Sequence, residues 1–174
     1  MRRGASSSSS PLGSQRFTEQ VTTGEVGGLA TPEDDDPSIP DADALYRRLS
    51  DSSPSMVAYD QETGERLRPS SGAFKPDPDG VSVYRRSRLE EDGLSGQDVA
   101  RHPWNLVASV DVGEVRSIAL GVRDDPWPSD IDEAEHPRNR AHALITGLER
   151  LGKNAQRRRQ QELVKLSSVT FVIG

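Results

Sequence analysis

The sequence predicts an α+β domain, in which a small, mostly antiparallel sheet is covered by two helices and preceded by a disordered tail. Three observations lead to this expectation. Short runs of alternating apolar and polar residues, typical of half-buried strands, recur after residue 44. Two longer segments, 87–101 and 148–166, are predicted to be helices. Residues 1–43 contain too few apolar side chains to offset the entropy of ordering them.

The chain has 174 residues, which is enough for one domain with a modest core. It contains no cysteine, so disulfides, thiol nucleophiles and thiolate metal sites are excluded. Arg2 and Arg3 are followed by a serine run instead of an apolar stretch, and no segment has the length of a membrane span. We therefore expect a soluble, cytoplasmic protein that does not engage a membrane.

Charge is unevenly distributed around the net value of −6. The expected tail, residues 1–43, holds three arginines against eight acidic residues, whereas residues 149–165 hold six basic residues against two acidic ones. The acidic cluster could lie against the basic helix as an electrostatic cover, or it could serve only to solubilise the chain. The remaining residues, 44–174, form the expected domain.

The first half of the domain is expected to consist of short strands. Leu45, Arg47 and Leu49 alternate with their neighbours, which predicts a strand over 44–49. A second strand over 56–59, a turn at Gly64 and a return over 66–68 would form a hairpin. Phe74 is the first residue large enough to anchor the core from this side. Residues 81–84 form a further strand, whose two valines share one face and leave Ser82 and Tyr84 on the other.

The second half alternates helices and strands. Residues 87–102 read as a helix broken at Gly93, whose second part opens with Ser95 and Asp98 as a capping box. Strands are expected over 106–112, 119–122 and 141–146, with one helical turn at 113–118 and an irregular acidic loop at 124–135. A helix over 148–166 and a strand over 169–173 complete the domain. The main sheet is expected to use the strands that contain Leu45, Val57, Val81, Leu106, Val122 and Ala141.

Four short segments together resemble a group of small prokaryotic proteins of no established activity. They are Leu45-Tyr46-Arg47-Arg48, the Ser-x-Ala-Phe box at 71–74, the Ser-Val strand at 82–83 and the His-Ala-hydrophobic strand at 142–144. The similarity spans residues 44–147. It implies a compact α+β domain and carries no function with it.

The first candidate site is an anion or nucleotide site. Arginine offers a planar fork to phosphate or carboxylate, and serine hydroxyls beside a strand can complete the site. The candidate ligand-binding residues are Arg47, Ser70, Ser71, Ser82, Tyr84 and His142. An arginine on a first strand and a serine on a later one also resemble the NAD site of ADP-ribosyltransferases. That site requires a catalytic acid, for which Glu114 is available but stands in the wrong kind of segment.

The histidines and the acidic loop offer other chemistry. None of the three histidines has a His or Cys partner at metal-ligand spacing, and His142 lies within an apolar strand, as either a core residue or an acid–base group. The acidic residues at 124–135 lack the glycine and terminal glutamate of a calcium loop. We expect neither a metal nor a cofactor.

The basic segment at 149–165 is the second candidate site. Its arginines and lysines could neutralise several phosphates and give salt-sensitive binding to nucleic acid, or they could form a solvated helix face. The candidate residues are Arg150, Lys153, Arg157, Arg158 and Arg159. We therefore expect a non-catalytic module that binds a protein partner or an anionic ligand; the alternatives are an NAD-dependent transferase and a nucleic-acid-binding protein.

Overall fold

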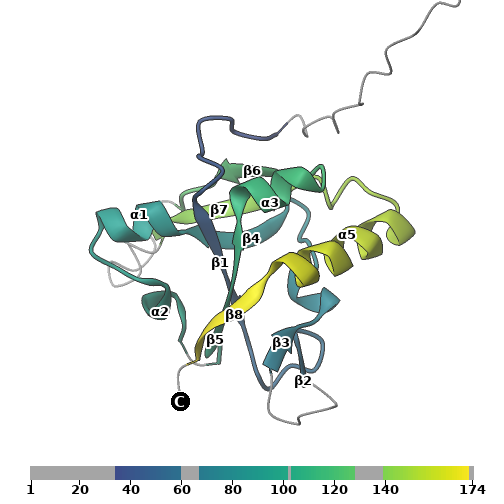
Figure 1. The fold of residues 1–174 in the computed structure, drawn as a ribbon, viewed down its shortest axis with the longest axis horizontal. Helices are drawn as coiled ribbons and strands as arrows, with labels where there is room; N and C mark the ends of the chain where they lie inside the picture. The colour runs from purple at the N-terminus through teal and green to yellow at the C-terminus, as the bar shows by residue number, and fades with distance from the viewer. Residues whose placement is uncertain (1–33, 60–66, 102, 128–138, 173–174) are drawn as a thin grey trace, which may run out of the picture.

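The computed structural model describes residues 34–59, 67–101, 103–127 and 139–172 and confirms the α+β fold (Figure 1). A six-stranded sheet has the order β6-β7-β4-β1-β5-β8, and every neighbouring pair is antiparallel. Its strands are β1 (Ala44–Leu49), β4 (Val81–Arg85), β5 (Leu106–Asp111), β6 (Gly121–Asp124), β7 (His142–Thr146) and β8 (Ser168–Val172).

The hairpin strands β2 (Val57–Tyr59) and β3 (Leu67–Pro69) form a separate two-stranded sheet. The prediction that the Val57 strand belongs to the main sheet is therefore wrong. Val57 pairs with Pro69, and the backbone N–H of Ser70 donates to the carbonyl of Met56 at 2.8 Å, so the hairpin satisfies its own backbone groups. The place beside β5 is taken by β8, the last described strand.

Helical segments cover both faces of the main sheet. They are the short 3₁₀ helix η1 (Ser71–Phe74) and the α-helices α1 (Arg86–Glu91), α2 (Gly96–Val99), α3 (Val112–Ser117) and α5 (Lys153–Leu166). The capping box of Ser95 and Asp98 at the start of α2 is confirmed. Helix α5 begins at Lys153, five residues later than predicted, because Gly147 has a φ of 98° and Leu148 is buried in a turn that closes on Leu151.

Alternation along the strands sorts the buried residues into two cores. Leu45 of β1 and Val83 of β4 face the larger core, which α3 and α5 cover, with Leu163 as the fully buried residue of α5. Tyr46 and Tyr84 face the other side, where α1 and α2 contribute Leu89 and Val99. Phe74, the expected anchor, is fully buried in the larger core. In Figure 1, α3 lies in front of the sheet and α5 extends to its right, while α1 and α2 lie at its left.

Residues 34–43, predicted to belong to the disordered tail, pack against the domain at the start of α3 and along β6 (Figure 1). Ile39 is only 1% exposed and belongs to the larger core. The guanidinium of Arg116 binds the Asp35 carboxylate at 3.2 Å and the carbonyl of Ile39 at 2.9 Å. Composition alone missed this segment because a single apolar anchor and a set of charge-assisted hydrogen bonds hold it.

Candidate functional site

Two hollows follow α5 along the side that faces η1 and β3. The first, of about 370 Å³, is lined by η1 and the N-terminal half of α5; the second, of about 380 Å³, is lined by β2, β3 and the C-terminal half of α5. Ser71 lines both. We call the two together the basic groove, and its lining residues are Ala58, Arg68, Pro69, Ser70, Ser71, Gly72, Lys75, Lys153, Gln156, Arg157, Gln160, Gln161, Val164 and Lys165.

The walls of the basic groove are held together by amide side chains of α5. Gln160 donates from Nε2 to the carbonyl of Phe74 at 3.1 Å, which ties the helix to the end of η1. Gln156 donates in the same way to the carbonyl of Leu148. The Gln160 bond therefore joins the helix to η1, whereas the Gln156 bond joins the helix to the turn that precedes it.

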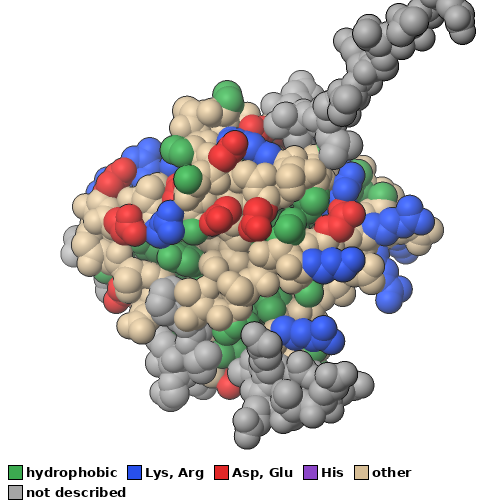
Figure 2. Space-filling view, in the orientation of Figure 1, with side chains coloured by type: hydrophobic (Ala, Val, Ile, Leu, Met, Phe, Trp, Pro, Cys, Tyr) green, Lys and Arg blue, Asp and Glu red, His purple; other side chains and the backbone are tan. Residues whose placement is uncertain are grey.

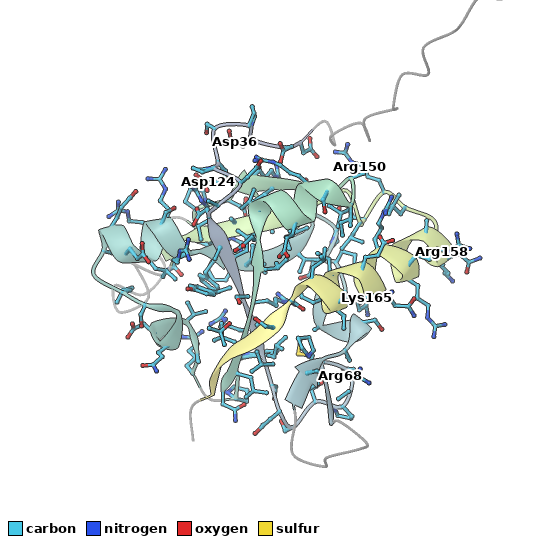
Figure 3. All side chains as sticks on the ribbon, viewed as in Figure 1. Asp36, Arg68, Asp124, Arg150, Arg158 and Lys165 are labelled. Carbon is cyan, nitrogen blue, oxygen red and sulfur yellow. The ribbon has the colours of Figure 1, made fainter. Side chains whose placement is uncertain are left out.

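Five cationic side chains line the basic groove, and no acidic side chain does. All five are exposed, and the structure gives none of them an ion pair within the described residues: Arg68, Lys75, Lys153, Arg157 and Lys165. Figure 3 shows Lys165 of α5 above Arg68 of β3, and Figure 2 shows Lys and Arg side chains gathered on the side of the molecule where α5 lies. A protein with a net charge of −6 thus keeps an uncompensated positive groove.

The structure divides the five residues predicted to bind nucleic acid. Lys153 and Arg157 line the groove. Arg158 is exposed on α5 but is not among the lining residues, and Arg159 pairs with Glu162 at 2.7 Å. Arg150 precedes the helix, where it pairs with Asp34 and Glu149.

Among the described residues, the acidic segment at 34–43 pairs with the predicted basic segment at one residue, Arg150, which precedes α5. Asp34 is the acid that pairs with Arg150, whereas Asp35 and Asp41 pair with Arg116 of α3 and Asp43 pairs with Arg85 of β4. Within the described residues, no carboxylate of the segment reaches the lysines and arginines of the groove. The predicted electrostatic cover therefore does not extend to the groove in the described part of the tail.

The predicted anion-site residues fall in three different places. Ser71 lines the groove, and Ser70 also lines it while its hydroxyl donates to the carbonyl of Ser55. Arg47 instead points into the larger core, where its Nε donates to the carbonyl of Ala73 at 3.0 Å and its Nη1 to the carbonyl of Ser82 at 2.7 Å. Burial lowers the pKa of the Arg47 guanidinium below its ordinary value. The Arg47 guanidinium therefore links β1 to β4 and to η1.

The side chains considered for an NAD site do not face one another, although Arg47 contacts the backbone of Ser82. Arg47 shares its side of β1 with Leu45 and Leu49, whereas the hydroxyl of Ser82 lies on the opposite side of the sheet with Tyr84. The Glu114 carboxylate accepts a hydrogen bond from the backbone N–H of Asp111 and completes the capping box of α3. The arrangement of an ADP-ribosyltransferase site is therefore not formed by these three residues.

Ser82, Tyr84 and His142 meet on that opposite side, together with two residues that follow β6. We call Ser82, Tyr84, Asp125, Trp127 and His142 the His142 cluster. The Ser82 hydroxyl lies 2.5 Å from Nε2 of His142, and the Asp125 carbonyl lies 2.7 Å from Nδ1. The Asp125 carboxylate is 3.2 Å from the same nitrogen. Tyr84 meets the imidazole edge-on, and Trp127 packs over it at 4.5 Å between ring centres.

This geometry assigns the tautomer of the neutral His142 imidazole. A carbonyl oxygen only accepts, so Nδ1 carries the proton and Nε2 is left to accept from the Ser82 hydroxyl. His142 is 2% exposed, and this burial lowers the pKa of its imidazole below 6.5, against the opposing effect of Asp125. Burial therefore favours the neutral imidazole at pH 7.

Several of these residues were missed by the sequence analysis. Lys75 and Arg68 flank the Ser70–Phe74 segment, and nothing in their sequence spacing relates them to α5. Asp125 and Trp127 lie in the loop predicted to be irregular, most of which is outside the described residues. In the described ranges, no group of three or more His, Asp or Glu side chains is arranged to hold a metal ion.

None of the described helices is both long and apolar enough to span a bilayer. Comparisons of this chain with models of known protein families, with curated proteins and with solved structures found no match. The resemblance to small prokaryotic proteins stays a prediction, and any function has to be argued from the two sites themselves.

Proposed function

We propose that this protein is a binding module for an anionic ligand that carries several phosphate groups, and that the basic groove is its binding site. The observation that carries this proposal is the set of five exposed cations along the groove without an acidic lining residue. Lysine and arginine bind phosphate through charge-assisted hydrogen bonds, and the Ser70 and Ser71 segment adds polar groups between them.

The shape of the groove favours an extended ligand. Lys153 and Lys165 lie at the two ends of α5, which are roughly 18 Å apart at the rise of an α-helix. Arg157 stands one turn after Lys153, while Lys75 and Arg68 supply charge from the opposite wall. A single phosphate would engage only one end of this row, whereas a single-stranded nucleic acid would use all of it.

The test uses fluorescence anisotropy of a labelled single-stranded oligonucleotide with the full-length protein. Arg157→Ala should weaken binding, whereas Arg158→Ala should leave it nearly unchanged, since both residues are exposed on α5 and only Arg157 lines the groove. The double variant Lys153→Ala/Arg157→Ala should also reduce the slope of log affinity against log salt by about 1.4, which corresponds to two phosphate contacts on a single strand.

If Arg157→Ala and Arg158→Ala reduce the affinity equally, the basic groove is not the binding site, and the oligonucleotide is attracted to the charge of the whole helix. Absence of binding at low salt would refute the nucleic-acid form of the proposal. Inorganic polyphosphate and a poly-glutamate peptide serve as competitors in the same assay. If polyphosphate displaces the oligonucleotide and the peptide does not, the result supports a phosphate ligand. If the peptide displaces the oligonucleotide equally well at the same concentration of charge, the result contradicts a phosphate ligand.

A further inference from the structure

We propose that Ser82 is the nucleophile of a second site, on the opposite side of the sheet from the basic groove, where it accepts an acyl group from a carboxylic ester. The inference is independent of the proposed binding function, since it uses none of the groove residues. It rests on the geometry that joins Ser82, His142 and Asp125.

The three side chains have the mutual arrangement of a nucleophile, a general base and a positioning residue. The Ser82 hydroxyl donates to Nε2 of His142 at 2.5 Å. Nδ1 of His142 donates to the backbone carbonyl of Asp125 at 2.7 Å, and the carboxylate of the same residue lies 3.2 Å from this nitrogen. A serine is a weak nucleophile by itself and becomes reactive when an adjacent base removes its proton. A third group that fixes the tautomer of the base completes this arrangement.

The surroundings hold the imidazole in one orientation and do not bury Ser82 completely. His142 is buried between Tyr84 and Trp127, so its ring is held in one orientation. Ser82 is only half-buried. Arg48 lies close enough to oppose protonation of His142 electrostatically and packs over the Tyr84 ring at 4.9 Å. A cation on this side of the sheet favours the negative charge that develops on an acyl oxygen.

The reaction balances with an ester and water alone. Ser82 Oγ attacks the carbonyl carbon, its proton moves to Nε2, and the C–O bond to the leaving alcohol breaks as the imidazolium returns the proton to the departing alkoxide. Water, deprotonated by the same imidazole, then attacks the acyl-serine and releases the acid. His142 accepts and returns one proton in each half of the cycle.

The experiment treats the full-length protein with a fluorophosphonate, which forms an Oγ–P bond to an activated serine while fluoride leaves, and locates the adduct by peptide mass spectrometry. We expect one adduct, at Ser82, that disappears in Ser82→Ala and persists in Ser109→Ala. Ser109 is a matched control because it is also a strand serine with a side-chain hydrogen bond, at 2.7 Å to Thr170, and no histidine. Absence of an adduct, or labelling spread over many serines, would overturn the inference.

A pH profile distinguishes chemistry from structure. Labelling requires neutral His142, so its rate should rise with pH through the pKa of His142. Asp125→Asn removes a carboxylate that favours the imidazolium and should move this rise to lower pH. His142→Gln should slow labelling by about 10²- to 10⁴-fold. Asp125 is half-exposed, so Asp125→Asn keeps the test valid if His142→Gln fails to fold; an unmoved profile would contradict the role of Asp125.

Discussion

The hydroxyl of Ser82 and Nε2 of His142 lie 2.5 Å apart although sixty residues separate them in the chain. The contact forms because β4 and β7 pair antiparallel with Tyr84 directly opposite His142, which places Ser82 one pleat away on the same face. It satisfies Nε2 of a buried imidazole, and burial lowers the pKa of that imidazole, so His142 affects the stability of the fold as well as its reactivity.

Stability should depend on pH through His142. Burial lowers the pKa of this histidine in the folded state below 6.5, so the unfolded chain binds more protons in the window between the two pKa values. The stabilisation is complete above pH 6.5 and is lost as the pH falls towards the folded pKa, with a slope of up to about 1.4 kcal/mol per pH unit. Urea unfolding at several pH values between 7.5 and 5 measures this dependence. The free energy of unfolding of His142→Gln should change less with pH than that of the parent protein. Equal slopes for the two proteins would contradict the buried neutral state.

Arg85 should be the most costly arginine to remove. Its Nε binds the buried Asp43 carboxylate at 3.0 Å, and its Nη1 binds Asp124 at 2.8 Å. Arg85→Ala would leave Asp43 buried without its cation, at a cost of about 3–5 kcal/mol in the free energy of unfolding. The neighbouring Arg86 is only partly buried; its Nε lies 3.8 Å from Glu90 and its Nη2 donates to the carbonyl of Ala42 at 2.9 Å, so Arg86→Ala should cost only about 1 kcal/mol. Chemical denaturation of both variants measures the difference, and similar losses would argue against the buried network.

The turn before β4 requires a glycine. Gly80 has a φ of 133°, and a Cβ there would lie 2.6 Å from the carbonyl oxygen of Ile145 on the neighbouring strand. Gly80→Ala should therefore lower the melting temperature by more than Gly93→Ala, because Gly93 also has a positive φ of 71° but faces open space. The backbone strain alone is worth about 1–2 kcal/mol. If the two variants melt alike, the close approach of Gly80 to β7 is not formed.

The segment at 34–43 should behave as part of the domain. Ile39 is 1% exposed in the larger core, so Ile39→Ala should destabilise the protein by about 2–5 kcal/mol. Pro37 is exposed in the same segment, and Pro37→Ala should change stability by no more than about 1 kcal/mol. Unfolding curves in urea compare the two. An Ile39→Ala variant as stable as the parent would place the start of the domain after this segment.

Part of this molecule follows from local sequence. The strands β1, β4 and β5, predicted at 44–49, 81–84 and 106–112 and found at 44–49, 81–85 and 106–111, depend on side-chain alternation. The break at Gly93 and the capping box at Ser95 depend on backbone freedom and on hydrogen bonds within a few residues. The same local rules place Ser82 and Tyr84 together on one face of their strand, as the structure confirms. Such features need no knowledge of distant neighbours.

Tertiary structure decided which distant residues meet. Arg47 and Ser82 are both polar residues on neighbouring strands. Because side chains alternate between the two faces of a sheet, the Arg47 side chain lies in the larger core and the Ser82 hydroxyl lies on the opposite face. Lys75 joins Lys153 and Arg157 because α5 packs on η1, and Ile39 enters the core because Arg116 holds the segment around it. These contacts depend on the order of the strands and on how the helices pack, which arise from burial of apolar surface over the whole chain. The spacing of residues in the sequence does not reveal them.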